Sequence, residues 1–443
     1  MTSQVQSTVE KSKIVEKRNA AIKGAFFTEF VDMFDIYLPT IILTPALSYF
    51  QPEELPQGMA GILTSLVFVT TLLGRPLGAT IFGALGDKIG RRKATISSVL
   101  GFGIITLLIA LLPGYSSIGI TAYWLLVLLR FLDGVFLGGG YTGSHPLAME
   151  YSEKHQRGFV GAFILSAFPL AYIVINLLGL AAFALIPQAG PDSPYAVWGW
   201  RIPFVIGALL AFWLAAYYIR KVPESETWES SKKEKNSLAS MFRGKTGRSF
   251  FQVFIMMTGF WLTQNIVTLI LPTTVLRTIL GLDGIQVTLT LFISYAVLFG
   301  SYIAAGVIGQ KIGRRRFFLI LGPAIVLVGS VLLAIILNGK ALPLPLIMLL
   351  VVLFSVIVTA PWGVIVTYIN ERFTTEVRAS GFGLGFSASV VLPSFYAFYM
   401  NWLGGIMSYN STIIALLIIG AVIGTVGAYL GPETKDVDFN QAE

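Results

Sequence analysis

The sequence predicts an all-α membrane protein whose twelve transmembrane helices form two pseudo-symmetric six-helix bundles. Of the 443 residues, 55% are hydrophobic and 12% are charged, and the mean hydropathy is +0.76. Apolar runs of about 20 residues, long enough to cross a ~30 Å hydrocarbon layer, recur along the chain. Residues 83–93 (GALGDKIGRRK) return as residues 306–316 (GVIGQKIGRRR), an offset of 223. Such a long internal repeat indicates two copies of one structural unit.

The six predicted spans of the first half are separated by short connections. Residues 1–21 are polar and lack the apolar core and small-residue cleavage site of a signal peptide, so the first span is expected to direct insertion. Spans two and three flank the 83–93 motif, and spans four and five flank a segment from Glu150 to Arg157. The predicted ranges are 22–50, 58–85, 93–114, 119–149, 157–186 and 200–220.

The second half repeats this order. Spans eight and nine flank residues 306–316, and spans ten and eleven flank Glu371 and Arg378, which are seven residues apart, as Glu150 and Arg157 are. No run of alternating polar and apolar residues indicates a β-barrel. The predicted ranges are 250–275, 285–309, 316–338, 342–370, 379–403 and 410–430.

A third landmark also occurs in both halves. Pro223-Glu224-Ser225 ends the first half as Pro432-Glu433-Thr434 ends the second. The matched landmarks indicate a tandem parallel repeat whose halves rock about a substrate site at the membrane midplane. The expected divisions are a cytoplasmic N-terminal tail 1–21, a first bundle 22–220, a cytoplasmic linker 221–248, a second bundle 249–430 and a cytoplasmic C-terminal tail 431–443.

The distribution of lysine and arginine predicts the orientation of the chain. With twelve spans both termini lie on one side, and 26 of the 31 basic residues fall in segments on that side. The opposite loops hold Arg201, Arg277 and Lys340. The positive-inside rule therefore places both termini in the cytoplasm of a multi-pass plasma-membrane protein.

Composition also excludes several classes of function. The chain has no cysteine, and His145 and His155 form no ligand cluster in the sequence, so neither a metal site nor a cofactor is expected. The net charge of +8 follows from topology, so no nucleic-acid partner is expected. No set of nucleophile, base and orienting residue can be assembled, which argues against an enzyme.

Glycine pairs in the spans predict close helix packing rather than a nucleotide site. Gly74 and Gly78, Gly134 and Gly138, and Gly381 and Gly385 each have the Gly-x-x-x-Gly spacing. None of these pairs follows a predicted β-strand, which a dinucleotide-binding motif requires.

These residues resemble the major facilitator superfamily over essentially the whole chain. The repeated motif is similar to the loop motif of that superfamily. Other segments resemble its metabolite:proton symporter and sugar-porter branches: Arg75-Pro-Leu-Gly78, Arg130-Phe-Leu-Asp-Gly134, Trp198-Gly-Trp-Arg-Ile-Pro-Phe204, Pro223-Glu-Ser225, Glu371-Arg-Phe373 with Arg378-Ala-Ser-Gly381, and Pro432-Glu-Thr-Lys435. The resemblance implies alternating-access transport of a small solute.

The repeated loops are predicted to form a gate. Asp87 can accept hydrogen bonds from a facing helix N-terminus, and Arg91 and Arg92 are expected to reach carboxylates such as Glu150 with bidentate geometry. Gln310 replaces Asp87 in the second copy, so the two latches should differ in strength. The resemblance implies that the gate stabilises the outward-facing state; alternatively, the loops only anchor topology. The expected gating residues are Gly83, Asp87, Gly90, Arg91, Arg92, Glu150, Arg157, Gly309, Gly313, Arg314, Glu371 and Arg378.

Acidic residues within the first span predict a proton site. Glu29, Asp32 and Asp35 lie within about 120° of one helix face, and ionised acids are costly in lipid. A rise of ~1.5 Å per residue places Asp35 level with Arg130 and Asp32 level with Arg75. Burial and a movable arginine shift a carboxylate pKa in opposite directions, so such a pair can bind and release protons. The predicted proton-coupling residues are Asp35, Arg130, Asp32, Glu29 and Asp133; the alternative is a static ion-pair network.

The resemblance supports this assignment most directly for Asp35 and Arg130. In proton-coupled sugar porters an aspartate of the first helix pairs with the arginine of the Arg-x-x-x-Gly motif in the fourth. Asp32 with Asp35 also resembles the Asp-x-x-Asp of aromatic-acid symporters.

Substrate contacts are expected from both halves. Arg75 can hold a carboxylate, and the second half offers neutral amide and aromatic side chains beside apolar walls. Each of these residues could instead serve helix packing. The predicted substrate-binding residues are Arg75, Gln264, Asn265, Tyr295, Trp362 and Tyr396.

The favoured function is a secondary active transporter, a monomeric proton symporter of an organic acid or a sugar in the lipid bilayer. A proton-driven exporter is the alternative within this class. A solute sensor that does not transport is the alternative from another class.

Overall fold

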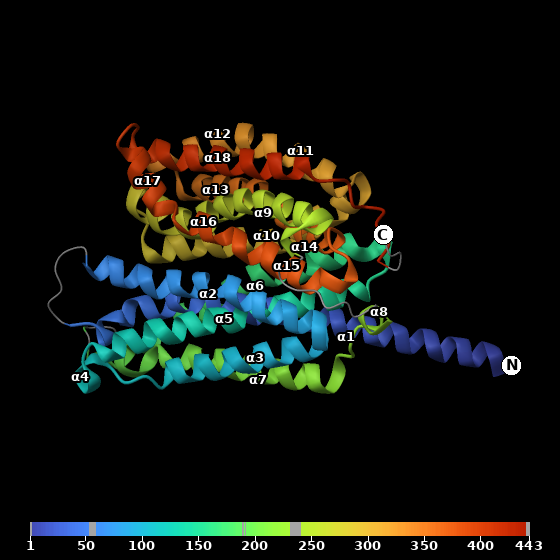
Figure 1. The fold of residues 1–443 in the computed structure, drawn as a ribbon. Helices are drawn as coiled ribbons and strands as arrows, with labels where there is room; N and C mark the ends of the chain where they lie inside the picture. Colours follow the sequence, from blue (N-terminus) through green and yellow to red (C-terminus); the bar gives the residue numbers. More distant parts are fainter. Residues whose placement is uncertain (1, 53–58, 188–189, 191, 231–240, 440–443) are drawn as a thin grey trace.

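The computed structural model describes residues 2–52, 59–187, 190, 192–230 and 241–439. Over these residues it contains helices and no strand, and twelve segments are long and apolar enough to cross a membrane. The predicted fold class is thus confirmed. Figure 1 shows the spans as two packed groups, one from each half of the chain.

The spans of the first half match six of the predicted segments. Span one combines a long helix with two irregular turns, and short elements connect the others. The elements are α1 (Thr2–Leu38), η1 (Pro39–Leu43), η2 (Thr44–Phe50), α2 (Met59–Ile89), α3 (Arg91–Ala110), α4 (Tyr115–Ile118), α5 (Thr121–Glu150), η3 (Lys154–Gln156), α6 (Arg157–Leu185), η4 (Tyr195–Gly199), α7 (Arg201–Lys221) and α8 (Glu226–Ser230).

The spans of the second half are more broken. Four of its six spans consist of two or more helical pieces in series. The elements are α9 (Gly244–Asn265), η6 (Ile266–Ile279), α10 (Gly284–Ile312), α11 (Arg314–Ala324), η7 (Ile325–Gly329), α12 (Ser330–Leu337), η8 (Gly339–Ala341), α13 (Leu344–Thr359), α14 (Trp362–Glu371), η9 (Thr375–Val377), α15 (Arg378–Ser387), η10 (Ala388–Val390), α16 (Val391–Ser394), α17 (Tyr396–Gly404) and α18 (Tyr409–Leu430).

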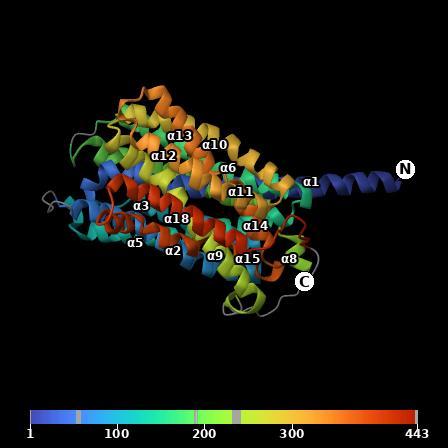
Figure 2. The same cartoon turned by 90° about the horizontal axis from the view of Figure 1, so that it is seen from above.

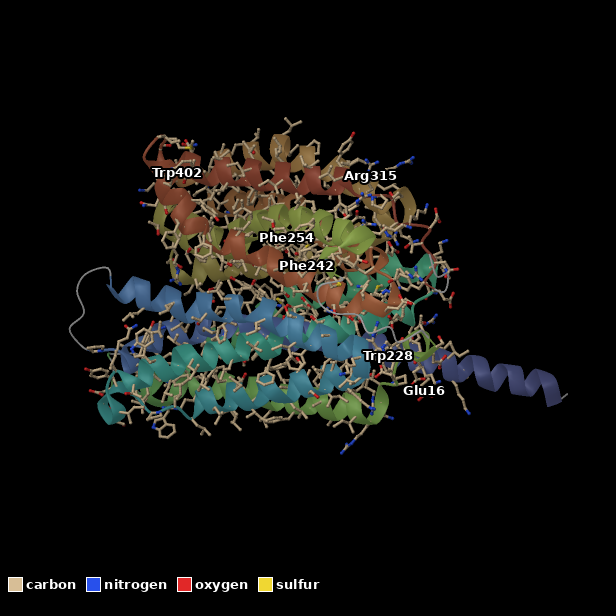
Figure 3. All side chains as sticks on the ribbon, viewed as in Figure 1. Glu16, Trp228, Phe242, Phe254, Arg315 and Trp402 are labelled. Atoms are coloured by element: carbon tan, nitrogen blue, oxygen red, sulfur yellow. The ribbon has the colours of Figure 1, made fainter. Side chains whose placement is uncertain are left out.

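The two halves pack side by side, and the described parts of both termini lie at one end of the bundle (Figures 1 and 2). We call this end the terminal face and the other end the opposite face. Trp228 and Arg315 lie toward the terminal face, and Trp402 lies at the opposite face (Figure 3). Between the halves, α6 packs along α10 and α14, while α2 packs along α15.

The N-terminal segment differs from the expected polar tail because α1 is continuous from Thr2 to Leu38. Residues 2–21 contain no glycine or proline and are rich in good helix formers, so the helix extends beyond the bundle (Figure 1). Lys17 pairs with Glu226 at 2.6 Å, and Arg18 pairs with Glu153 at 2.9 Å. These exposed pairs hold the extension near α8 and η3.

Spans seven and eleven both deviate from regular helix near the middle of the bundle. Span seven changes from α9 to the π-helical segment η6 directly after Asn265, and Pro272 lies within η6. Span eleven passes through the 3-10 turn η10 before α16, which contains Pro393. Proline removes a backbone donor and crowds the preceding turn, which explains the local irregularity. Both irregular regions face the same cavity, described below.

Two of the three predicted glycine pairs lie at a close contact between helix backbones. A Cβ atom at Gly74 or Gly78 would collide with the backbone of α5, and one at Gly134 or Gly138 would collide with the backbone of α2. The absence of side chains therefore lets α2 and α5 approach closely and places Arg75 beside the fourth span.

Candidate substrate and proton sites

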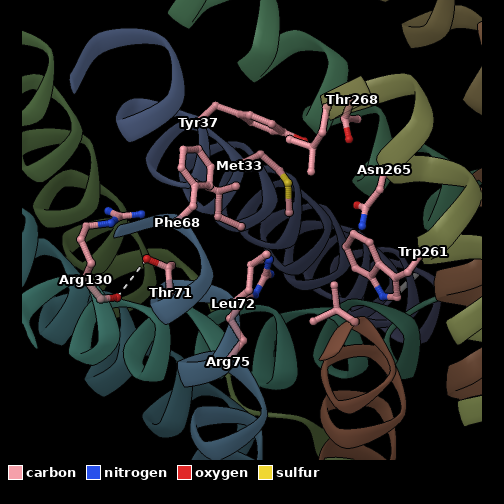
Figure 4. A pocket seen from close by; sticks show the side chains of 13 residues that line it. Met33, Tyr37, Phe68, Thr71, Leu72, Arg75, Arg130, Trp261, Asn265 and Thr268 are labelled. Atoms are coloured by element: carbon pink, nitrogen blue, oxygen red, sulfur yellow. Dashed lines mark hydrogen bonds between the residues drawn. The ribbon is translucent and has the colours of Figure 1, made fainter. Parts of the chain in front are cut away.

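A cavity of about 50 Å³ lies between the two halves. Its walls come from α1, α2 and α5 of the first half and from α9, η6 and η10 of the second. Aromatic and aliphatic side chains, including Tyr37, Phe68 and Trp261, form most of the lining (Figure 4). This composition, apolar walls with a few polar groups, is typical of sites that bind small organic molecules.

Arg75, Asn265 and Thr268 are among the lining residues whose polar groups can orient a solute. Arg75 donates to Asp32 at 2.9 Å through Nη2, and its guanidinium lies 4.8 Å from the ring centre of Tyr141. Asn265 donates through Nδ2 to the carbonyl of Pro393 at 3.1 Å. The Thr268 hydroxyl donates to the carbonyl of Gln264 at 3.0 Å. Arg75 and Asn265, both predicted from the sequence, thus face one cavity from opposite halves (Figure 4).

The other predicted substrate residues lie outside the lining. Gln264 is buried beside Asn265, and Trp362 packs edge-on against Trp261 at 4.5 Å between ring centres. Tyr295 stacks on Tyr172 across the two halves, with ring centres 3.9 Å apart. Tyr396 follows the interruption at Phe395, so it belongs to α17 and does not line the cavity. These side chains support the wall or lie beyond it.

Two ion pairs border the cavity at the positions expected from the sequence. Asp32 pairs with Arg75 at 2.9 Å, and Asp35 pairs with Arg130 at 3.3 Å. Arg130 also contacts Asp133 at 2.8 Å, one turn further along α5. The Thr106 hydroxyl donates to Asp35 at 2.8 Å. All of these charged side chains are at most 3% exposed.

Arg130 is therefore shared by two buried carboxylates. Two ionised acids on one guanidinium leave a net negative charge, which a low-dielectric site disfavours. A single proton on Asp35 or Asp133 neutralises the group. The group Asp35, Arg130 and Asp133 can thus exchange a proton next to the cavity.

The first copy of the motif joins the two halves at the terminal face. Ala379 and Ser380 donate their backbone N–H groups to the Asp87 carboxylate at 3.2 and 3.0 Å, and the Ser380 hydroxyl donates to it as well. These amides open α15, so the carboxylate also meets the positive end of a helix dipole. A Cβ atom at Gly83 would come within 2.8 Å of the Ser380 Cα, so glycine permits this approach.

Glu150 adds an ion pair between the halves. Arg378 of α15 donates to Glu150 at 2.8 Å, and Arg91 lies 3.4 Å from the same oxygen. Arg91 also donates to the carbonyls of Gly86 at 2.9 Å and Thr375 at 2.5 Å. The contact of Arg91 with Glu150 runs through one atom pair and is not bidentate as expected.

The prediction that Arg92 reaches Glu150 is wrong. Its guanidinium donates to the carbonyls of Tyr218 at 3.3 Å and Ile219 at 2.8 Å. Arg92 thus caps the end of α7, where helix carbonyls lack partners.

The second copy of the motif makes weaker contacts between the halves. Gly158 at the start of α6 donates its N–H to the Gln310 side chain at 2.9 Å. Arg314 binds Glu371 through two nitrogens at 3.2 and 3.1 Å, and it donates to the Gly309 carbonyl at 3.2 Å. Arg314 and Glu371 both belong to the second half. The bidentate pair therefore strengthens one half instead of joining the two.

Two further carboxylates complete the motif, and sequence reasoning did not assign them a role. Glu224 accepts from the N–H groups of Arg91 and Arg92 at 2.9 and 3.2 Å, and Glu433 accepts from Arg314 and Arg315 at 2.7 and 3.1 Å. Both cap the N-terminus of a helix. Burial raises the pKa of the Glu224 carboxyl above its ordinary value, although the donated N–H groups oppose the shift.

The capping carboxylates explain the glycines that precede the two arginine runs. Gly90 has φ of +111° and Gly313 has φ of +105°, a region that side-chain-bearing residues rarely adopt. A Cβ atom at either glycine would also collide with the capping carboxylate. The repeat of Pro-Glu-Ser/Thr was the available sequence signal for this contact.

The C-terminal segment contacts Arg157. Arg157 donates to the carbonyl of Val437 at 2.7 Å, and its guanidinium lies 3.5 Å from the ring centre of Phe439. Arg378 of the other half lies 3.8 Å from the same ring centre. Phe439 is thus held between one arginine of each half.

A family model of the Major Facilitator Superfamily matches residues 25–300, and a model described as sugar (and other) transporter matches residues 225–443. The inner membrane metabolite transport protein YhjE of Escherichia coli is 28% identical, covering 92% of this chain and 94% of that protein. The alpha-ketoglutarate permease of Escherichia coli is 30% identical, covering 85% of each chain.

A proline/betaine transporter of Escherichia coli is 26% identical, covering 95% of this chain and 84% of that protein. Among solved structures, the proton:xylose symporter XylE matches with a TM-score of 0.74 at 19% identity, covering 94% of this chain and 96% of that one. At this identity the structural match demonstrates the fold alone.

Proposed function

We propose that this chain, which belongs to the Major Facilitator Superfamily, is a proton-coupled symporter of a small metabolite that carries a carboxylate. The family and its curated relatives establish the coarser statement that the chain is a multi-pass membrane transporter of metabolites. The observation that carries the proposal is the sharing of Arg130 by Asp35 and Asp133 beside the cavity. Proton binding there changes the charge that the bound solute meets.

The cavity favours a carboxylate because the Arg75 guanidinium lines it. Arg75 donates to Asp32 and is also hydrogen-bonded to Tyr141, and its five N–H groups leave further donors for a solute. A guanidinium can bind a second carboxylate through a further pair of N–H groups. Alpha-ketoglutarate, proline and betaine, after which two relatives are named, all carry a carboxylate. Aromatic walls then contact the rest of a small solute.

The contacts at the terminal face support an outward-facing state. The Asp87, Glu150 and Gln310 contacts all join the halves at this face. We propose that this face is cytoplasmic, because most of the lysine and arginine residues lie there. These three contacts, which we call the latch, would then close the cytoplasmic exit while solute and protons enter from outside. Release would follow when the latch opens.

A sugar is the second candidate substrate. The match of the second half to the sugar (and other) transporter model favours it, as do the neutral side chains of Asn265 and Thr268 in the cavity. Neutral amides and hydroxyls are suitable partners for sugar hydroxyl groups. In this case Arg75 would serve only to hold Asp32.

Ligand-induced stabilisation separates the two candidates. Purified protein would be heated with alpha-ketoglutarate, proline, glycine betaine or xylose, because a ligand at ~100 times its Kd stabilises the native state by about 2.7 kcal/mol. We expect at least one carboxylate to raise the melting temperature and xylose to have no effect. Stabilisation by xylose alone would reject the carboxylate class.

Transport by proteoliposomes tests the coupling. We expect an inward proton gradient to drive uptake of the stabilising compound, and counterflow to occur without a gradient. Gradient-stimulated efflux would indicate an exporter instead. Binding without counterflow would indicate a sensor.

A further inference from the structure

We propose that Glu29 and His145 form a second proton-binding site, located between the cavity and the terminal-face latch. This inference rests on the proposed proton symport and adds a residue, His145, that the sequence did not connect with any acid. The Glu29 side chain is 2% exposed and that of His145 1%, and their facing atoms Oε2 and Nε2 are 3.4 Å apart. The pair joins α1 to α5.

The backbone determines which nitrogen of His145 carries a proton. Nδ1 lies 2.9 Å from the carbonyl oxygen of Tyr141, and a carbonyl can only accept a hydrogen bond. Nδ1 therefore carries the hydrogen in the neutral ring, which leaves Nε2 as a bare acceptor. Nε2 faces the carboxylate of Glu29, which is an acceptor as well.

Two facing acceptors require one more proton. Neither Nε2 of His145 nor Oε2 of Glu29 has a hydrogen-bond partner elsewhere in the described part of the chain. A proton on either atom turns the repulsion of two lone pairs into an attraction in a dry site. The pair is neutral when it holds this proton and negative when it has lost it.

The buried charges of the first half also indicate a second bound proton. Near mid-depth the first half buries four acids, Glu29, Asp32, Asp35 and Asp133, against two guanidinium groups, Arg75 and Arg130. Two protons balance this excess. One belongs to the acids that share Arg130, and the Glu29–His145 pair can hold the other. The titratable groups that act on the pair include Asp32 on α1, Arg75 on α2 and Tyr302 on α10, which interact electrostatically with Glu29. Tyr141 on α5 contacts the ring of His145, and Tyr218 lies on α7, which packs along α1.

The position of the pair couples it to the gate. The His145 ring stacks on Phe382, with ring centres 5.3 Å apart and planes inclined by 25°. Phe382 belongs to α15, the helix whose first amides bind Asp87. When the latch opens and α15 withdraws, His145 loses this cover. Water can then reach the pair and take its proton, which leaves the carboxylate of Glu29 charged and the ring of His145 neutral.

Histidine-selective ¹⁵N NMR tests the site without any substrate. The chain has two histidines, and the variant His155→Gln identifies the signals of His145. We expect Glu29→Gln to move the pH midpoint of His145 by at least about one unit, because a charge within ~4–6 Å has an effect of this size. The midpoint of exposed His155 should not move. An unchanged His145 midpoint, or no titration of His145 in either protein, would overturn the proposal.

Transport measurements test the role of the site. His145→Asn keeps an amide donor for the Tyr141 carbonyl but cannot bind the proton, and Glu29→Gln removes the acid. The transported compound is alpha-ketoglutarate, or else proline or xylose if the wild type accumulates one of these instead. We expect both variants to accumulate it about tenfold less per pH unit, the contribution of one proton, and to retain counterflow. His155→Gln should behave as wild type. Full accumulation by both variants overturns the inference while the proposed symport stands. A wild type with no gradient-driven uptake rejects the proposed symport, and the NMR result then decides the proton site by itself.

Discussion

The two halves share one architecture, but they use charge differently. At mid-depth the first half contains Asp32, Asp35 and Arg130, while the second half faces the same cavity with Trp261, Asn265 and other neutral side chains. At the terminal face, Asp87 of the first copy accepts three hydrogen bonds from the other half, whereas Gln310 of the second accepts one.

The acids at the ends of spans four and ten also differ in whether they bind the other half. Glu150 binds Arg378 across the interface, but Glu371 binds Arg314 of its own half. Under the proposed function, the duplicated backbone supplies the rocking geometry. The charges of the first half make that geometry responsive to protons, and the second half contributes a neutral wall to the cavity.

The largest effect is expected for Glu150→Gln. The change leaves Arg91 and Arg378, both almost fully buried, without their carboxylate, and breaking a buried pair costs about 3–5 kcal/mol. We expect the latched state to lose population by at least about a hundredfold, since ~1.4 kcal/mol is tenfold. Spin labels on Lys93→Cys and Arg316→Cys in this cysteine-free chain would report the opening.

Glu371→Gln is the matched control. It removes a carboxylate from Arg314 within one half, so we expect a lower melting temperature with little change in the spin-label distance. Equal opening by both variants would contradict the asymmetry.

A smaller effect is expected for Asp87→Asn. The substitution removes the charge that receives the two N–H groups of α15, and hydrogen bonds to a charged group contribute about 1.5–3 kcal/mol. We expect a ~30-fold shift toward the open latch and slower transport at normal expression and folding, measured by the same label pair and by uptake. Gln310→Ala should shift the latch several-fold less. Unchanged uptake by Asp87→Asn would remove Asp87 from the gate.

Asp35→Asn tests the coupling itself. One proton per solute converts one unit of pH gradient into about tenfold accumulation, since a pH unit is worth ~1.36 kcal/mol. We expect Asp35→Asn to lower the accumulation about tenfold per pH unit, the contribution of one proton, while counterflow persists. Asn265→Ala, on the neutral side of the cavity, should weaken affinity and retain accumulation. Full accumulation by Asp35→Asn would exclude Asp35 as the proton carrier.

The smallest effect is expected for Phe439→Ala. The ring lies between Arg157 and Arg378, and a cation–π contact contributes about 0.5–2 kcal/mol. We expect a few-fold shift toward the open latch, detected with the spin labels. Phe398→Ala, an exposed residue of α17, should have no effect. A shift of equal size in both variants would show that Phe439 has no special role.

Much of the mid-depth arrangement could be predicted because helical rise is uniform. Counting residues from the span ends placed Asp35 level with Arg130 and Asp32 level with Arg75, and both pairs are present. The partner of Asp87 was predictable as a helix N-terminus from charge alone. The role of His145 was missed, because its distance from Glu29 along the chain carries no periodic signal.

The contacts at the terminal face show more clearly which features could not be predicted from the sequence. Arg91 and Arg92 are adjacent and chemically identical, so the sequence assigned both to Glu150. On a helix, neighbours point about 100° apart, and Arg92 therefore meets the end of α7 instead. Glu224 and Glu433 could be matched as repeats, but their partners lie more than a hundred residues away.

Twelve spans, their duplication and the charge difference between Asp87 and Gln310 could all be inferred from the amino-acid sequence. These features depend on local hydropathy and on repeated residues. The tertiary structure alone decided which acids share Arg130, that Glu150 crosses the interface while Glu371 does not, and that His145 faces Glu29. Such contacts depend on the rotation and depth of each helix against its neighbours, which are set by the packing of the whole bundle.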